Sequence, residues 1–493
     1  MKTLGLGVAL LSSILSLSAA SASFEITYVD EDGAGAFSTT PLTLPDGTTT
    51  TLGERRQELI EFTTRAVGLQ FKSDIPAKLH IDFGVPEGFG ALTIGPFYSE
   101  FTEYDEPDDF GVLQVGRRYP STLWDALVSK NLSGDYEDAS VSFSDTFEYA
   151  EYSEGHEYPY IVYAAYHELM HVMGFGTTDC LGNCIPEPVS NPSHISGHFY
   201  YNDNGTVRNF DDLSIEDKTE AYKSTTDLWF YGSEATTKAV ENELVSGHVD
   251  GYIYMHSTPH EETGNVDPQG GSHISPLVEP AQLMHSYGAL TDDLGMAAYI
   301  LCDIGWCRNE GRVIEQSVAI TLNENESTET EAVIDIEVVD NLDVGVDEWE
   351  LNLRPENLDV ISFMDTEDRC VETSKGYHCT GTLLPSELAA FKLIVTPAEY
   401  YEIQGELRST GYDVDRNGFN NIADVILYAP ESEDDPVDPV DPVDPVNDDE
   451  PPVIETPTDS SGGGSMAYLL LPLLFITAYR RLNFSIFTNK IVE

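Results

Sequence analysis

The 493-residue sequence predicts an α+β domain, made of a twisted sheet and a buried central helix, followed by an Ig-like β-sandwich. Three observations support this prediction. Strand-like and helix-like patterns alternate near the start of the chain, and one strongly apolar helix is indicated at 159–173. Beyond residue 308, short alternating strands follow one another and helical periods are scarce. We therefore expect a first domain over 23–308 and a sandwich over 309–430.

The first domain opens with a strand, a helix and a second strand. Residues 24–29 alternate between apolar and polar side chains, as in a half-buried strand. Residues 51–67 repeat apolar side chains at helical spacing, and 79–83 again have the pattern of a strand. This order favours helices packed in layers on a sheet.

The central helix has clear start and stop signals. Pro159 suits a first helical turn, and Gly174 and Gly176 stop the helix. Apolar residues on more than one side predict that the helix is buried, and these are Ile161, Ala164, Ala165, Leu169 and Val172.

The second domain is indicated by residues 312–322 and 331–339, which alternate in strand fashion. Further strand-like runs follow at 349–353, 360–363, 390–395 and 423–428. Short strands separated by turns are typical of a small Ig-like β-sandwich.

The N-terminus has the parts of a secretory signal peptide over residues 1–22. Lys2 supplies the positive start, 4–17 is apolar, and Ala20-Ser21-Ala22 fits a small-x-small cleavage site. A buried N-terminal helix is the alternative interpretation. We expect an exported protein whose mature chain begins at Ser23.

The six cysteines fall into three close pairs, and an exported protein permits disulfides. None of the pairs has zinc-ribbon spacing, so we expect three local disulfide bonds rather than metal ligands. They are Cys180–Cys184, Cys302–Cys307 and Cys370–Cys379.

The chain is strongly acidic. Its 24 basic and 86 acidic residues give a formal net charge of -62. Such a surface repels nucleic acid and anionic membranes, so we expect neither as a binding partner.

An HExxH motif lies on the predicted central helix: His167-Glu168-Leu169-Met170-His171. Positions i and i+4 share one helix face, so both imidazoles can reach one zinc ion. We expect His167 and His171 to bind the metal and Glu168 to be the catalytic general base, which takes a proton as water on the ion attacks a peptide carbonyl. The alternative is a surface helix with two solvated histidines.

The third zinc ligand does not follow locally. Many metalloproteases continue this motif to HExxHxxGxxH, and here Gly174 is kept but Thr177 occupies the position of the last histidine. Asp179 lies two residues too far along. A distant Ser-His pair ends at His273, and a Leu-Met pair ending at Met284 follows it.

These segments together resemble the metzincin zinc metallopeptidases, in particular their leishmanolysin-like bacterial secreted branch. In that branch a long insertion separates the HExxH helix from a later Ser-His ligand, and a Met-turn follows. The resemblance covers most of 24–308, with 291–306 similar to the closing helix of these enzymes. It implies a metzincin-like catalytic fold, with His273 as the third zinc ligand and Met284 as the Met-turn methionine beneath the metal. The other candidate ligands, each with the alternative of a solvated loop residue, are His194, His198, Asp179, His256 and His260.

Two further expectations concern the same domain. Tyr287 either stabilises the oxyanion, as a tyrosine near the Met-turn does in some metzincins, or is a packed side chain. No cysteine precedes the HExxH helix, so we expect no latency through a cysteine that caps the zinc.

Asp413 to Asp424 (Asp-x-Asp-x-Asn-Gly, then Asn421 and Asp424) fits the spacing of an EF-hand-type calcium loop. The alternative is ordinary β-hairpin turn chemistry, because a strand-like run follows and no clear helix flanks the loop.

The C-terminal residues comprise a linker and a tail. Residues 431–461 are acidic and Pro-rich, with a repeated Asp-Pro-Val unit, and we expect them to be extended. Residues 462–493 combine a Gly-rich stretch, a short apolar transmembrane segment and a basic end, and resemble a GlyGly-CTERM sorting signal. The resemblance implies transient inner-membrane anchoring and cleavage by a rhomboid-type sorting protease in a Gram-negative bacterium. A permanent tail anchor is the alternative.

The sequence therefore predicts a secreted zinc metalloendopeptidase that acts on extracellular proteins or peptides. Two alternatives stay open. One is an inactive zinc-containing surface adhesin or binding protein, and the other is a metal hydrolase acting on a non-peptide bond.

Overall fold

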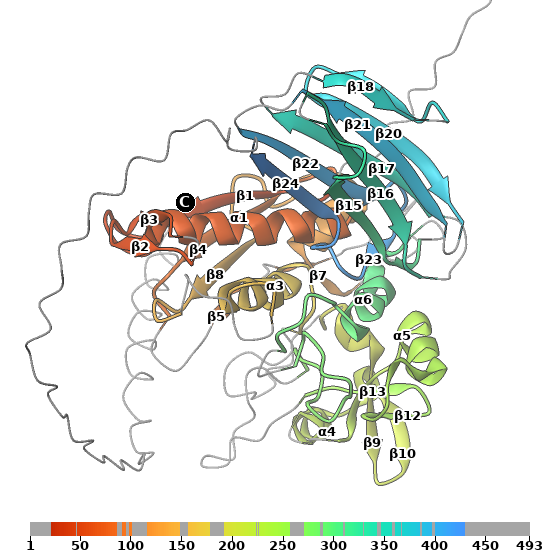
Figure 1. The fold of residues 1–493 in the computed structure, drawn as a ribbon. Helices are drawn as coiled ribbons and strands as arrows, with labels where there is room; N and C mark the ends of the chain where they lie inside the picture. Colours follow the sequence, from red (N-terminus) through yellow and green to blue (C-terminus); the bar gives the residue numbers. More distant parts are fainter. Residues whose placement is uncertain are drawn as a thin grey trace, which may run out of the picture. The chain divides into compact units, whose positions relative to one another are not determined.

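The computed structural model describes residues 21–45, 47–85, 91–94, 98–100, 116–147, 156–177, 192–222, 224, 226–256, 271–285, 289–308, 311–328, 330–342, 347–356, 360–365, 367–384, 387–396 and 400–428. These residues form a mixed α/β fold in which most of the regular structure is sheet (Figure 1). Among them no helix is long and apolar enough to cross a membrane. The predicted linker and sorting tail lie outside the described residues, as do Cys180–Cys184, Asp179, His260 and Tyr287.

The first sheet has the order β1-β4-β8-β5. Its strands are β1 Phe24–Tyr28, β4 Ala77–Asp82, β8 Ala139–Phe143 and β5 Ala91–Ile94. The first three are parallel, and β5 pairs with β8 antiparallel. Alternate residues of β4 and β8 are buried, so one face of the sheet is covered.

Three helices occur in this part of the chain: α1 Leu52–Gln70, α2 Ser121–Val128 and α3 Tyr160–Val172. The helices α1 and α3 pack against each other and against the sheet (Figure 1). A capping box starts α1, because the Thr51 hydroxyl accepts from the Glu54 N–H and the Glu54 carboxylate accepts from the Thr51 N–H. The predicted helix 51–67 is thus present and extends to Gln70.

A second sheet lies in the long segment between the HExxH motif and His273. Its order is β10-β9-β11-β13-β12, and all its strands are antiparallel. The strands are β9 Phe199–Asp203, β10 Thr206–Asn209, β11 Leu228–Phe230, β12 His248–Val249 and β13 Tyr252–Tyr254. The short helices α4 Ile215–Ala221 and α5 Ser233–Lys238 accompany it, and α6 Met296–Leu301 follows later. The segment 291–306, where a helix was expected, contains α6 and a π-helical turn at Cys302–Trp306.

Smaller elements complete this part of the chain. Two-stranded pairs are β2 Pro41–Thr43 with β3 Thr49–Thr51, and β6 Tyr98–Glu100 with β7 Arg118–Pro120. Short 3-10 turns occur at Gly35–Phe37, Ile195–His198 and Phe210–Asp212, and a second π-helical turn at Ala239–Glu243.

The C-terminal part is a two-layer β-sandwich of antiparallel sheets. One sheet has the order β15-β16-β21-β18, with β15 Gln316–Leu322, β16 Ala332–Asp340, β21 Leu388–Val395 and β18 Val360–Met364. The other has the order β19-β20-β17-β22-β24, with β19 Cys370–Thr373, β20 Gly376–Leu383, β17 Asp347–Glu356, β22 Tyr400–Ser409 and β24 Ile422–Tyr428. Side chains of both sheets form one hydrophobic core, which includes Ile336 and Phe391 from one and Trp349 and Leu407 from the other. The predicted arrangement of short strands is confirmed, and β19, β20 and β22 are additions to it.

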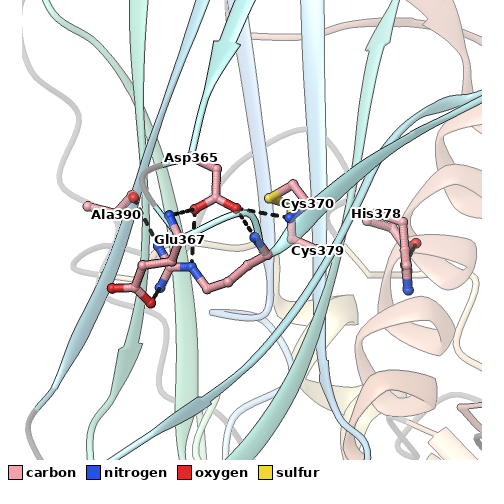
Figure 2. Close-up of a disulfide and its surroundings, with 8 residues drawn as sticks. Asp365, Glu367, Cys370, His378, Cys379 and Ala390 are labelled. Atoms are coloured by element: carbon pink, nitrogen blue, oxygen red, sulfur yellow. Dashed lines mark hydrogen bonds and ion pairs between the residues drawn. A yellow bond between two sulfur atoms is a disulfide. The ribbon is translucent and has the colours of Figure 1, made fainter.

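Two predicted disulfides are present, Cys302–Cys307 and Cys370–Cys379. The second joins the paired strands β19 and β20. Figure 2 shows that the Asp365 carboxylate lies beside it, where it accepts from the backbone N–H groups of Glu367, Arg369 and Cys370. These bonds hold the turn that leads into β19.

The sandwich contributes to the core of the first domain. The short parallel pair β14 Val313–Ile314 and β23 Val414–Asp415 leads into a loop whose Phe419 ring lies 5.5 Å from Phe62 on α1 and 5.0 Å from Tyr166 on α3. Val313, Val414 and Phe419 are buried in the same hydrophobic cluster as the central helix. Residues on both sides of the predicted domain boundary between 308 and 309 thus share one hydrophobic cluster, and the boundary itself stays a prediction.

Candidate metal centre

The helix α3 carries both histidines of the HExxH motif on one face. The ring centroids of His167 and His171 are 5.0 Å apart, as expected for residues one turn apart. The helix is buried on several sides, as its sequence predicts. Its C-terminal carbonyls find partners: the Thr122 hydroxyl donates to Val172 O (2.6 Å), and the Trp306 indole N–H donates to Met173 O (2.8 Å).

Gly174 ends the helix in a left-handed conformation, with φ of +102°. The chain then turns back, so that the Phe175 N–H donates to Met170 O (2.9 Å). This turn brings the Phe175 carbonyl oxygen to 2.6 Å from His171 Nδ1.

His273 reaches the same face from 102 residues further along the chain. Its backbone is held by hydrogen bonds to neighbouring segments: the His256 N–H donates to His273 O (2.8 Å), and the Ile274 N–H donates to Met284 O (2.8 Å). The Ser272 hydroxyl accepts from the Thr177 N–H (3.3 Å). Thr177, which occupies the position of the expected third histidine, therefore holds the segment that carries His273.

Three imidazole nitrogens converge. His273 Nε2 lies 3.1 Å from His167 Nε2 and 3.3 Å from His171 Nε2. Two nitrogens bound at 2.0–2.1 Å to a tetrahedral ion would be roughly 3.3–3.4 Å apart, so the spacing matches a shared metal ion. Among the described residues, these three histidines form the one group of His, Cys, Asp or Glu side chains that could hold a metal ion.

The other ring nitrogens fix the orientation of the two helix histidines. His167 Nδ1 lies 2.7 Å from Leu283 O, and His171 Nδ1 lies 2.6 Å from Phe175 O. A carbonyl oxygen only accepts, so each Nδ1 carries the proton and each Nε2 presents a lone pair. One N–H on His273 could not satisfy both lone pairs that face it. A bound cation would satisfy the Nε2 lone pairs of all three rings.

Burial keeps these rings in the form that binds metal. It lowers the pKa of His167 to about 4, an effect increased by His171, and it also lowers the pKa of His171 to about 4. Both imidazoles are therefore neutral near pH 7 and available as ligands.

Glu168 follows His167 on α3 and is 8% exposed. Burial raises the pKa of its carboxyl, and His167 and hydrogen bonds from Thr93 oppose this effect. The Thr93 hydroxyl, on strand β5, lies 2.6 Å from Glu168 Oε2 and 3.1 Å from Glu168 O. The Thr93 hydroxyl thus fixes the position of one carboxylate oxygen.

The predicted Met-turn segment takes part in the site through its backbone. Leu283 O is the partner of His167 Nδ1, and Met284 is fully buried in the core that includes α3.

The other candidate ligands that the structure describes are His194, His198 and His256, and none of them joins the group of three histidines. The His198 ring stacks on Phe230, with centroids 5.3 Å apart, and His194 packs 5.4 Å from Tyr119. The His256 ring centroid is 6.5 Å from that of His273. His194 and His256 are buried, whereas the alternative interpretation expected solvated loop residues.

The proposed calcium loop has its carboxylates engaged in a turn. Asp415 accepts from the Gln316 N–H, the Asn417 N–H and the Asn421 side-chain amide, at 3.0–3.2 Å. Asp424 forms an ion pair with Arg65 (3.4 Å). These contacts agree with the hairpin-turn interpretation, and calcium there stays a prediction.

Sequence reasoning did not find Thr93 or the carbonyl of Leu283. Neither residue type marks a site by itself, because both act through contacts between segments far apart in the chain.

Comparisons with known proteins leave the family open. No family model matches the chain, and no curated protein matches it. A solved CARDB domain from Pyrococcus furiosus, in complex with di-metal ions, shares 16% identity over 23% of this chain and 92% of that one, with a TM-score of 0.17. The BSP domain of a biofilm-associated protein shares 11% identity over 24% and 30%, with a TM-score of 0.17. The bacterial hydrophobin BslA shares 16% identity over 24% and 94%, with a TM-score of 0.16. Scores at this level do not indicate a common function.

Proposed function

We propose that this chain is an exported zinc-dependent endopeptidase with a metzincin-like catalytic domain and an Ig-like β-sandwich. The observation that carries the proposal is the convergence of three Nε2 atoms at 3.1 and 3.3 Å, with the buried Glu168 next to His167 on the same helix.

The donor set favours zinc. Neutral imidazole suits zinc, and three protein ligands leave a fourth tetrahedral position open, which is typical of catalytic rather than structural sites. In a structural site, a glutamate held beside the ligands would have no task. Cu²⁺ and Ni²⁺ also bind imidazole, so metal analysis of the purified protein is part of the test.

His167, His171 and His273 would hold the ion. When bound, zinc would lower the pKa of a water molecule and polarise the scissile carbonyl. Glu168 would take the proton as the water attacks, at the oxygen that Thr93 does not occupy. Burial favours its role, because a carboxylate with a raised pKa holds the proton more firmly.

The long separation between the helix and His273 supports the leishmanolysin-like branch. The described part of the intervening chain includes a five-stranded sheet and two short helices, and the segment ends in the Ser272 and His273 pair. The buried Met284, next to the carbonyl that orients His167, suits a Met-turn methionine.

The proposal extends to the ends of the chain. Export through the N-terminal signal would allow both described disulfides to form. The GlyGly-CTERM-like tail would give transient anchoring, rhomboid-type cleavage and display or release outside a Gram-negative cell. Intact mass measurement of the exported protein tests the tail, since a chain that still ends at Glu493 contradicts cleavage.

The experiment is metal analysis and casein cleavage by the purified exported protein, before and after chelation. We expect one zinc per chain, cleavage that is lost with the chelator and cleavage that returns with zinc. His273→Ala should lose both zinc and activity. His80→Ala is the matched control, because His80 lies on β4 and pairs with Glu137 (3.9 Å) away from the site. Zinc at full occupancy without cleavage of any protein would favour a binding protein or adhesin, and full occupancy in His273→Ala would exclude His273 as a ligand.

A further inference from the structure

Ser21 and Ala22 belong to the folded domain, although the sequence assigns them to the signal peptide. The Ser21 backbone forms an antiparallel bridge with Lys72. The Ala22 N–H donates to Phe71 O at 2.8 Å. These bonds tie the chain to the segment that follows α1 before β1 begins.

Ala22 is also part of the core. It is 9% exposed and lies in the main hydrophobic cluster with the residues of α1 and α3. Its carbonyl oxygen approaches the last turns of α1 so closely that a Cβ at Gly68 would lie 2.4 Å from it. Glycine is unfavourable inside a helix relative to alanine, so its presence at position 68 indicates that the helix is shaped to receive Ala22.

Ser21 has further contacts from the sandwich. Arg408, on β22, donates to the Ser21 hydroxyl (3.1 Å) and pairs with Glu350 (2.5 Å). Ser21 also lines a cavity together with Ser409, Gly411, Asp413 and Asp415.

The sequence offers several small-x-small patterns at this place, and two of them end in alanine. Ala20-Ser21-Ala22 would direct the cut to the bond after Ala22, and Ser18-Ala19-Ala20 would direct it to the bond after Ala20. The first cut removes the Ala22 N–H bond, the buried methyl group and both contacts of Ser21. The second cut keeps the Ala22 N–H bond, the buried methyl group and the contact of Ser21 with Arg408.

We propose that the export signal is removed after Ala20 and that the mature chain begins at Ser21. The inference rests on the expectation of an exported protein and is independent of peptidase activity.

N-terminal sequencing of the exported full chain tests the position of the cut. The protein is expressed with its own N-terminal segment in a Gram-negative host and purified from the exported fraction. We expect Ser21 as the first residue of most chains. A first residue of Ser23, or a chain that begins at Met1, would overturn the proposal.

Gly68→Ala gives a second test whose sign depends on Ala22. In the chain exported with its own signal, the new methyl group meets Ala22 O, so we expect a lower thermal midpoint than that of the unchanged protein. The control is the same substitution in a chain whose signal peptide is replaced so that it begins at Ser23. In that chain Ala22 is absent, so the new methyl group meets no carbonyl and alanine favours the helix. Gly68→Ala should therefore raise the thermal midpoint of the chain that begins at Ser23. A rise in the chain exported with its own signal would contradict the proposal.

Discussion

The contact between Thr93 and Glu168 gives the sharpest test of how the site is organised. Thr93→Val removes one hydroxyl from β5 and leaves a side chain of similar shape. The hydrogen bond from Thr93 Oγ1 to Glu168 Oε2 is 2.6 Å long, and Glu168 is 8% exposed, so water has little room to replace it. If Glu168 acts as the base, the loss of this bond should affect the reaction directly.

A hydrogen bond to a charged group contributes about 1.5–3 kcal/mol. If that bond orients the carboxylate in the transition state, its loss should lower kcat/KM by about 10- to 150-fold, since each 1.4 kcal/mol is about tenfold. We expect the decrease to appear in kcat, because Thr93 positions the base and touches no substrate in this account.

The assay is cleavage of a casein-derived peptide by the zinc-loaded protein, with zinc content and thermal midpoint measured on the same samples. Thr93→Ser is the matched control, because it keeps the hydroxyl and should keep most of the activity. The reasoning is refuted if Thr93→Val retains full kcat with zinc bound, or if Ser and Val variants lose the same amount.

Two further predictions concern stability. Burial raises the pKa of Asp415 from 3.8 to about 7, so the folded protein holds this proton more tightly than the unfolded chain. The protonated side chain adds roughly 4 kcal/mol at most to the free energy of unfolding below pH 4, and this contribution is lost as the pH rises to about 7. Denaturation at pH 5 and pH 8 should therefore show a smaller pH effect for Asp415→Asn than for the unchanged protein, and an equal effect in both would contradict this. The Cys370–Cys379 disulfide closes a loop with a sequence separation of 9, so replacing both residues by alanine should cost about 2.5 kcal/mol; an unchanged thermal midpoint would show that strand pairing of β19 and β20 suffices.

Local sequence signals predicted the elements that depend on local physics. Apolar side chains at helical spacing over 51–67 predicted α1, and Pro159 and Gly174 bracket α3 as expected. Long alternating runs such as β16 were also predictable, because each places a full set of apolar side chains on one face.

The missed strands lack such a signal. The strands β11, β12 and β13 have only two or three residues each, too few for a pattern of alternation. Glycines interrupt the alternation in β20 and β22, where Gly381 lies against Trp349 and Gly405 against Ile320. These strands depend on neighbours supplied by the rest of the sheet.

The site, too, contains residues that local sequence predicts and contacts that only the fold creates. The two helix histidines follow from spacing alone, and the resemblance pointed to His273. The Leu283 carbonyl that orients His167 is 116 residues away in the chain, and Thr93, which contacts Glu168, is 75 residues away, so both contacts depend on the fold. The role of Phe419 behind α3 was equally invisible, because its loop offered only turn and calcium interpretations.

The central claim is that Glu168 is the base of a zinc peptidase. Its most direct test is the rate of casein cleavage by Glu168→Gln and the unchanged protein, each shown to hold one zinc per chain. We predict that the variant keeps its zinc and loses nearly all cleavage. Equal cleavage by both proteins at equal zinc content would contradict the account.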